Sequence, residues 1–149
     1  PMGMENSAFF LKELKVETIS KTYTLVDDRL TFKGFNGYPD YPAGQLRTSI
    51  ADYTKLIMGY LNADNAPFIL NATTVNLITP PISDDHEDRL YTWFLRKTND
   101  NWYYQHDGAD LGARAEAIID IKNNNAIVIF TNSGADLSSL MEKIESIVF

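Results

Sequence analysis

The sequence predicts an α+β fold in which an antiparallel β-sheet carries flanking helices. Two observations indicate this class. Apolar residues recur at helical spacing after Ser49 and again near the C-terminus. The stretch between residues 88 and 131 instead contains short runs of strand-forming residues separated by polar turns. Helices, then antiparallel strands, then a final helix are typical of α+β proteins, and we expect a single domain over residues 1–149.

The composition is that of a folded chain and excludes several classes of function. The 149 residues are 44% hydrophobic and 22% charged, and none is cysteine. Disulfide scaffolds, thiolate zinc sites and cysteine nucleophiles are therefore excluded, while a cytoplasmic and a periplasmic location both stay open. A net charge of −7 gives no basic face, so nucleic acid is not an expected partner. No apolar run approaches the ~20 residues that span a bilayer, and we expect no membrane span.

Residues 1–48 are expected to be irregular and loop-rich. One strand is predicted over residues 22–26, ending at Asp27-Asp28. The stretch 34–44 concentrates Gly, Pro, Asn and Tyr, which predicts an ordered loop anchored by its aromatic side chains.

Residues 49–81 are expected to be helical. Ser49-Ile50-Ala51-Asp52 resembles a capping box with Asp in place of Glu, and apolar residues follow on one helical face. Residues 62–67 end this helix. Asn71 then caps a shorter helix that carries Val75 and Ile78 and stops at Pro80-Pro81. Asn71 also starts a glycosylation sequon, but a helix cap is the simpler interpretation.

Residues 88–149 are expected to form the sheet and a C-terminal helix. Runs over 90–95 and 102–106 flank a turn at 98–101 and predict a hairpin. Runs over 114–121 and 126–130 flank the Asn-rich turn 122–125 and predict a second hairpin. Apolar residues from Leu137 to Val148, after the candidate caps Ser133 and Asp136, predict an amphipathic helix packed on the sheet.

Four short stretches carry a family resemblance through their order and spacing. Pro1-Met2-Gly3-Met4 resembles P-L-G-M, and residues 41–49 resemble a P-A-G-G-L-R-S-T loop in which Gln45 replaces the second glycine. His106-Asp107-Gly108, followed by Gly112, resembles a third catalytic motif of the form [K/H]-x-G. Residues 126–133 resemble V-V-V-L-T-N-S. In this order, the four stretches resemble the C-terminal half of the β-lactamase-like serine hydrolases: class C β-lactamases, DD-peptidases of the penicillin-binding-protein group and related esterases.

The resemblance implies the C-terminal part of the β-lactamase/transpeptidase-like fold, with the third motif on a strand that walls the active site. It implies that His106 contacts a substrate carboxylate or the proton-transfer network, that Gly108 lets substrate approach, and that the Ala109 N–H serves the oxyanion hole. Asp107 departs from the small or hydroxyl residues common at its position, and Ala113 replaces an aromatic residue. The candidate catalytic residues are thus His106, Asp107, Gly108 and Ala109. A glycine-containing bulge beside an ordinary exposed histidine is the alternative.

The nucleophile of such an enzyme is absent from this sequence. The family supplies it as S-x-x-K, and no serine here has a lysine three residues on. Tyr60-Leu61-Asn62 matches the second motif Y-x-N, but Tyr60 falls on the apolar helix face and chance accounts for the match. We therefore expect a C-terminal fragment of a secreted or periplasmic serine hydrolase that acts on a small-molecule or peptide substrate (a β-lactam, a D-Ala peptide or an ester). It should be inactive without the S-x-x-K segment. The alternative is a non-catalytic binding or assembly module that forms homodimers through exposed sheet edges.

Three further features have two interpretations each. His86, within the acidic stretch 83–88, belongs either to a metal cluster or, as we favour, to a solvated loop. Arg47 either ties its loop to the body or is a plain surface residue. Aromatic side chains of the first hairpin either line an acyl-binding face or, as is commoner, pack across strands: Trp93, Trp102, Tyr103 and Tyr104. No cofactor and no metal is expected.

Overall fold

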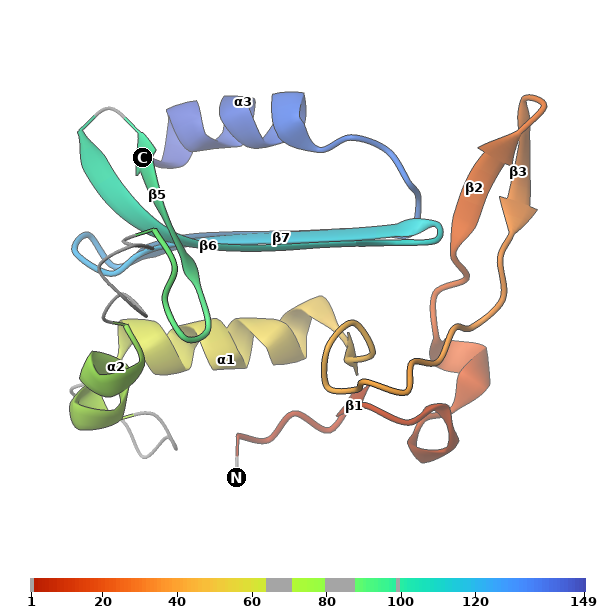
Figure 1. Ribbon diagram of the computed structural model, residues 1–149, viewed down its shortest axis with the longest axis horizontal. Helices are drawn as coiled ribbons and strands as arrows, with labels where there is room; N and C mark the ends of the chain where they lie inside the picture. Colours follow the sequence, from red (N-terminus) through yellow and green to blue (C-terminus); the bar gives the residue numbers. More distant parts are fainter. Residues whose placement is uncertain (1, 64–70, 80–87, 99) are drawn as a thin grey trace.

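The computed structural model describes residues 2–63, 71–79, 88–98 and 100–149. Four antiparallel strands form the central sheet in the order β5-β6-β7-β8, which is also their order in the chain. They are β5 (Phe94–Thr98), β6 (Asn101–Asp110), β7 (Ala113–Asp120) and β8 (Asn125–Thr131). Helix α3 (Ser138–Val148) covers one face, and α1 (Ile50–Leu61) and α2 (Ala72–Ile78) lie on the other (Figure 1). The α+β fold with flanking helices is confirmed.

Alternation along the strands creates a core on each face of the sheet. On the α1 face, Ile57 and Tyr60 pack with Trp93, Ala117 and Ile119. On the α3 face, a second cluster contains Tyr103, Ile118, Ile127 and Met141. Ile118 and Ile119 are 1% and 0% exposed, so β7 is buried from both sides and forms the centre of the fold.

Helices α1 and α2 begin at the residues that the sequence predicts. The Ser49 side chain accepts the Asp52 N–H at 3.1 Å, and the Asn71 side chain accepts the Thr74 N–H at 2.9 Å. The expected reciprocal half of the capping box is wrong, because the Asp52 carboxylate accepts hydrogen bonds from Asn6 and Ser7 instead. The expected stop at Pro80-Pro81 lies outside the described residues.

Both predicted hairpins of the sheet are present, with shifted bounds. β5 starts at Phe94, not Leu90, because the Leu90 N–H bonds to the Trp93 carbonyl at 2.8 Å and closes a tight turn that buries both side chains. β6 runs on to Asp110, not His106, because its second half pairs with β7. The 122–125 turn is stabilised by the Asp120 carboxylate, which accepts the Asn123 N–H at 3.0 Å.

The first 48 residues contain more structure than the sequence predicts. Two short 3-10 helices span Leu11–Glu13 and Val16–Thr18, and β1 (Ser7–Ala8) pairs with β4 (Arg47–Thr48). The predicted strand is β2 (Tyr23–Val26), and a partner that we did not predict, β3 (Arg29–Phe32), completes a hairpin. Asp27 and Asp28 have positive φ angles and form its turn. This hairpin stands beyond the end of the β6–β7 hairpin (Figure 1).

The C-terminal helix packs on the sheet as predicted. Its first turn is held by Asp136, whose carboxylate accepts the Ser138 N–H at 3.0 Å and the Ser138 hydroxyl at 2.7 Å. Ser133 does not cap the helix; its hydroxyl accepts the Ala135 N–H at 3.3 Å. At the buried side of the helix, Glu145 forms an ion pair with Arg96 of β5 at 2.8 Å. No helix in the described ranges is long and apolar enough to cross a membrane.

Candidate active-site wall on strand β6

The second half of β6 has an outer edge with which no other strand in the described part of the chain pairs, and we call it the free edge. β5 ends at Phe94, which pairs with Gln105, whereas β7 continues to pair with β6 as far as Asp110. Among the described strands, none pairs with the outer edge of residues 106–110. All four candidate residues, His106, Asp107, Gly108 and Ala109, lie in this half of the strand and are exposed.

The turn between β6 and β7 fixes which backbone groups face this free edge. Asp110 pairs with Ala113 across the two-residue turn Leu111-Gly112. The pair that closes a two-residue hairpin exchanges hydrogen bonds, and hydrogen-bonded and non-hydrogen-bonded pairs then alternate along the ladder. The Ala109–Arg114 pair is consequently non-hydrogen-bonded. The N–H and C=O groups of Ala109 and Asp107 therefore point away from β7, toward the free edge.

The side chains of this segment alternate between the two faces of the sheet. His106 lies on the α1 face, where its ring centroid is 6.1 Å from that of Trp93 and 6.2 Å from that of Phe94. Gly108 and Asp110 follow on the same face. A Cβ atom added at Gly108 would meet no atom within 4 Å, so the space above the strand is open there.

Asp107 lies on the opposite face from His106. It lines a hollow of about 220 Å³ beside α3, together with Gln105, Glu116 and Asp136. Burial raises the pKa of the Glu116 carboxyl, the nearby Arg96 guanidinium lowers it, and the negative charge of Asp107 raises it further. The net pKa is raised. The unusual acidic residue of the motif thus acts on the α3 side, away from the histidine.

The loop over residues 34–48 reaches the end of the free edge. Burial of Asp110 acts to raise the pKa of its carboxyl, but hydrogen bonds from the Tyr38 hydroxyl, the Leu111 N–H and Asn36 outweigh burial and lower it. The same hydrogen bond raises the pKa of Tyr38. Neither residue was singled out from the sequence, although Asp110 shares the alternation of His106 and Gly108 and this signal could have identified it.

Buried polar side chains keep this loop in place. Gln45 is 7% exposed, and its amide donates to the Phe9 carbonyl at 2.8 Å while its oxygen accepts the Tyr38 N–H. Arg47 donates to the same Phe9 carbonyl at 3.0 Å and to the Asn36 carbonyl. Arg47 therefore ties the loop to the body, and Gln45, which departs from the family loop, has a structural role of its own.

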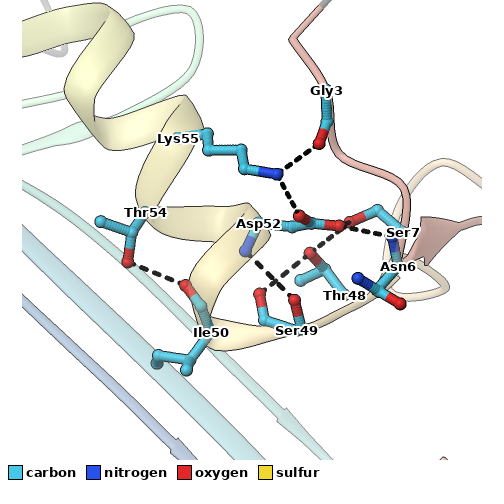
Figure 2. Close-up of polar contacts among 9 residues, drawn as sticks. All are labelled: Gly3, Asn6, Ser7, Thr48, Ser49, Ile50, Asp52, Thr54 and Lys55. Carbon is cyan, nitrogen blue, oxygen red and sulfur yellow. Dashed lines mark hydrogen bonds and ion pairs between the residues drawn. The ribbon is translucent and has the colours of Figure 1, made fainter.

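A second polar cluster fastens the N-terminal segment to α1 (Figure 2). Asp52 is 1% exposed and accepts the Asn6 N–H at 2.6 Å and the Ser7 hydroxyl at 3.0 Å. Lys55 pairs with Asp52 at 2.8 Å and donates to the Gly3 carbonyl. The hydrogen bond and positive charge of Lys55 outweigh burial and lower the pKa of Asp52.

The remaining candidate residues lie in different parts of the structure. Tyr60 is buried and packs edge-on against Trp93 at 5.3 Å, so the Y-x-N string belongs to the core. Tyr103 stacks on Phe149 on the α3 face at 4.7 Å, and Trp102 is 59% exposed beneath Lys97. The aromatic residues of the first hairpin thus do not form one face. His86 lies outside the described residues, and within the described ranges no group of three or more His, Asp or Glu residues could hold a metal.

An antiparallel sheet between helices, with His106-Asp107-Gly108 on one strand, is the arrangement that the resemblance to serine β-lactamases and penicillin-binding proteins implies. A family model described as Beta-lactamase matches residues 1–147, and the chain belongs to this family. The structure of the octameric penicillin-binding protein homologue from Pyrococcus abyssi is similar to this chain, with a TM-score of 0.77 and 20% sequence identity. The match covers 99% of this chain and 34% of the homologue. The structure of a penicillin-binding protein from Bacillus halodurans matches with a TM-score of 0.76 and 18% sequence identity. This match covers 98% of this chain and 46% of the Bacillus halodurans protein. The chain thus spans between a third and a half of these structures. No curated protein matches it.

Proposed function

We propose that this chain is a single domain and forms the C-terminal portion of a longer serine hydrolase. It supplies one wall of an acyl-transfer site, and the nucleophile of that site lies in an S-x-x-K segment of the longer protein. The observation that carries the proposal is the free edge of β6 at residues 106–110. An extended substrate can pair with such an edge through main-chain hydrogen bonds. Gly108 leaves open space beside it.

The proposed roles follow from the register of β6. The outward N–H of Ala109 would donate to the oxyanion that forms when the acyl carbonyl is attacked. His106, on the α1 face, would contact the substrate carboxylate or pass a proton. Asp107 would offer its outward N–H and C=O groups to the substrate backbone, while its side chain stays on the α3 face. The substrate would be a β-lactam, a D-Ala peptide or an ester.

The decisive experiment compares the chain alone with a longer protein. Purified residues 1–149 should neither hydrolyse nitrocefin or p-nitrophenyl esters nor take up a fluorophosphonate or penicillin label, because no serine in the sequence is followed by a lysine three residues on. The coding sequence upstream of Pro1 should hold S-x-x-K and Y-x-N in frame, and the protein that includes them should be labelled. Covalent labelling of a serine in the 149-residue chain would refute the proposal.

A second candidate is a non-catalytic binding or assembly module that uses exposed sheet edges to form homodimers. The outer edge of β8 favours it, since β8 is an apolar strand and, within the described ranges, pairs only with β7, on its inner edge. The Pyrococcus abyssi homologue is itself described as octameric. An upstream coding sequence without S-x-x-K would favour this function over the first.

A further inference from the structure

The β2–β3 hairpin has one apolar face. Its register pairs Tyr23 with Phe32 and Leu25 with Leu30, and side chains of such directly paired residues share a face. The four apolar side chains therefore form a single stripe, which we call the hairpin face. The other side of the hairpin carries Thr24, Val26, Arg29 and Thr31. Leu25 and Leu30 are 66% and 69% exposed, and Phe32 is 42% exposed.

Among the described residues, the hydrogen bonds that attach the hairpin to the body lie near its base. The Tyr23 N–H donates to the Asn132 carbonyl at 3.0 Å, and the Asn132 side chain donates to the Lys21 carbonyl at 3.0 Å. The remaining length projects away from the sheet (Figure 1). A two-stranded hairpin is marginally stable by itself in water. A partner that covered the hairpin face would bury apolar surface and would thereby stabilise the hairpin as well as the complex.

The charges at the two ends of the hairpin face indicate what that partner is. Lys21 stands at the base, with its ammonium 5.7 Å from the centre of the Phe32 ring. Asp27 and Asp28 form the tip. If two hairpin faces pack antiparallel about a two-fold axis, the acidic tip of each copy lies opposite the basic base of the other. In such a dimer, opposite charges face each other at both ends of the contact, and apolar side chains face apolar side chains between them. An anionic membrane surface would instead be repelled by the acidic tip.

We propose that the hairpin face is the docking surface for a second copy of this chain, forming a two-fold dimer. This surface is separate from the β6 wall and from the outer edge of β8. Four side chains per copy make a contact smaller than the ~1,200 Å² of stable complexes, so the dimer is weak and depends on concentration.

Sedimentation velocity over a concentration series tests the proposal on the 149-residue chain. The wild type should pass from monomer to dimer as its concentration rises through the Kd. Leu25→Lys with Leu30→Lys should raise the Kd by at least tenfold, because two ammonium groups per copy would be buried in the apolar contact, against Tyr23 and Phe32 of the other copy. Ile147→Lys, at an 83% exposed position of α3, is the matched control and should leave the Kd unchanged. Circular dichroism should show equal folding in both variants.

Two further variants separate this surface from the alternatives. Lys21→Glu should weaken the dimer more than Lys122→Glu, which changes the same charge in the distant β7–β8 turn. Val128→Pro should have no effect on the Kd; its N–H faces the outer edge of β8 by the same ladder alternation, so proline blocks pairing at that edge alone. A monomeric wild type at all concentrations, a hairpin variant that dimerises like the wild type, or a dimer dispersed only by Val128→Pro would each overturn the proposal.

Discussion

The carboxylate of Asp52, in the first turn of α1, accepts the backbone N–H of Asn6 at 2.6 Å, across 46 residues of sequence. Asp52 is almost fully buried, and Lys55 neutralises it at 2.8 Å. A buried carboxylate that satisfies a main-chain donor holds the N-terminal segment against the helix, and loss of the carboxylate leaves the partner groups unsatisfied.

Asp52→Asn should therefore lower the thermal midpoint by roughly 5 °C, since it removes the charge that Lys55 and the Asn6 N–H both need. Differential scanning calorimetry measures the change. Asp100→Asn is the control: Asp100 also pairs with a lysine three residues away, but it is 95% exposed, and its replacement should shift the midpoint by less than about 1 °C. Equal shifts would show that Asp52 is an ordinary surface ion pair.

The pH dependence of stability should change in the same variant. The folded-state pKa of Asp52 lies below its unfolded value, so its contribution is fully present above about pH 4 and is lost as the pH falls through the lower folded pKa. Asp52→Asn should consequently lose less stability than the wild type between pH 5 and acid pH, measured by urea unfolding. Parallel curves for the two proteins would contradict this assignment.

Gly112 should tolerate substitution poorly. Its φ is +72°, and a Cβ atom there would lie 2.6 Å from the Tyr23 nitrogen. Gly112→Ala should reduce the free energy of unfolding by about 3 kcal/mol, from backbone strain and the clash with the hairpin base. Gly108→Ala, in an open part of the same hairpin, should change it by less than about 1 kcal/mol. Chemical denaturation of both variants decides the comparison.

Proline substitutions should distinguish the two edges of β6. The Ala109 N–H faces outward, so Ala109→Pro removes no ladder hydrogen bond. It should lower the free energy of unfolding by about 1 kcal/mol or less. The Gly108 N–H faces β7, and Gly108→Pro should cost about 3 kcal/mol. In a longer protein that carries S-x-x-K, Ala109→Pro should also reduce kcat by about 100-fold or more, as expected for loss of an oxyanion donor. Similar stability losses in the two variants would contradict the register of donors.

Glu116 should oppose folding at neutral pH. Its folded pKa is raised, first by burial, so folding favours the protonated form. The stability linked to this protonation is fully present below the unfolded value of about 4.3 and is lost as the pH rises through the folded pKa. Glu116→Gln should therefore raise the free energy of unfolding at pH 7, by less than about 1 kcal/mol, and should leave it unchanged at pH 4. The contact at 3.1 Å from the Gln105 amide can persist in the variant, and urea titrations at both pH values test the difference.

The main elements of the fold were predictable because their signals are local. Ser49 and Asn71 cap their helices, and the alternation after residue 94 reflects a sheet buried on both faces. The sequence does not predict β3, because an Asp-Asp pair can end a strand as well as form a turn; the positive φ angles of Asp27 and Asp28 make them a hairpin turn. The early start assigned to β5 has a similar cause: Leu90 and Trp93 are apolar, but a turn buries them.

The candidate site was only partly predictable, because its neighbours come from distant parts of the chain. The motif at His106-Asp107-Gly108 located the strand, but nothing local indicated that the Asp107 side chain would lie on the α3 face beside Glu116 and Asp136. Tyr38 meets Asp110 only through the folding of the 34–48 loop. The role of Asp52 was misassigned for the same reason, since its partners lie 45 and 46 residues away.

The sheet is a meander whose four strands pair in the order in which they are made. Such a topology has short loops to close, so residues 94–131 can acquire their register rapidly and before the N-terminal segment docks. The ladder amides of β7, shielded on both faces, should then be among the slowest to exchange with deuterium. Within β6, the outward amides of Asp107 and Ala109 should exchange fast between slow neighbours, leaving an alternating pattern that records where the sheet stops pairing.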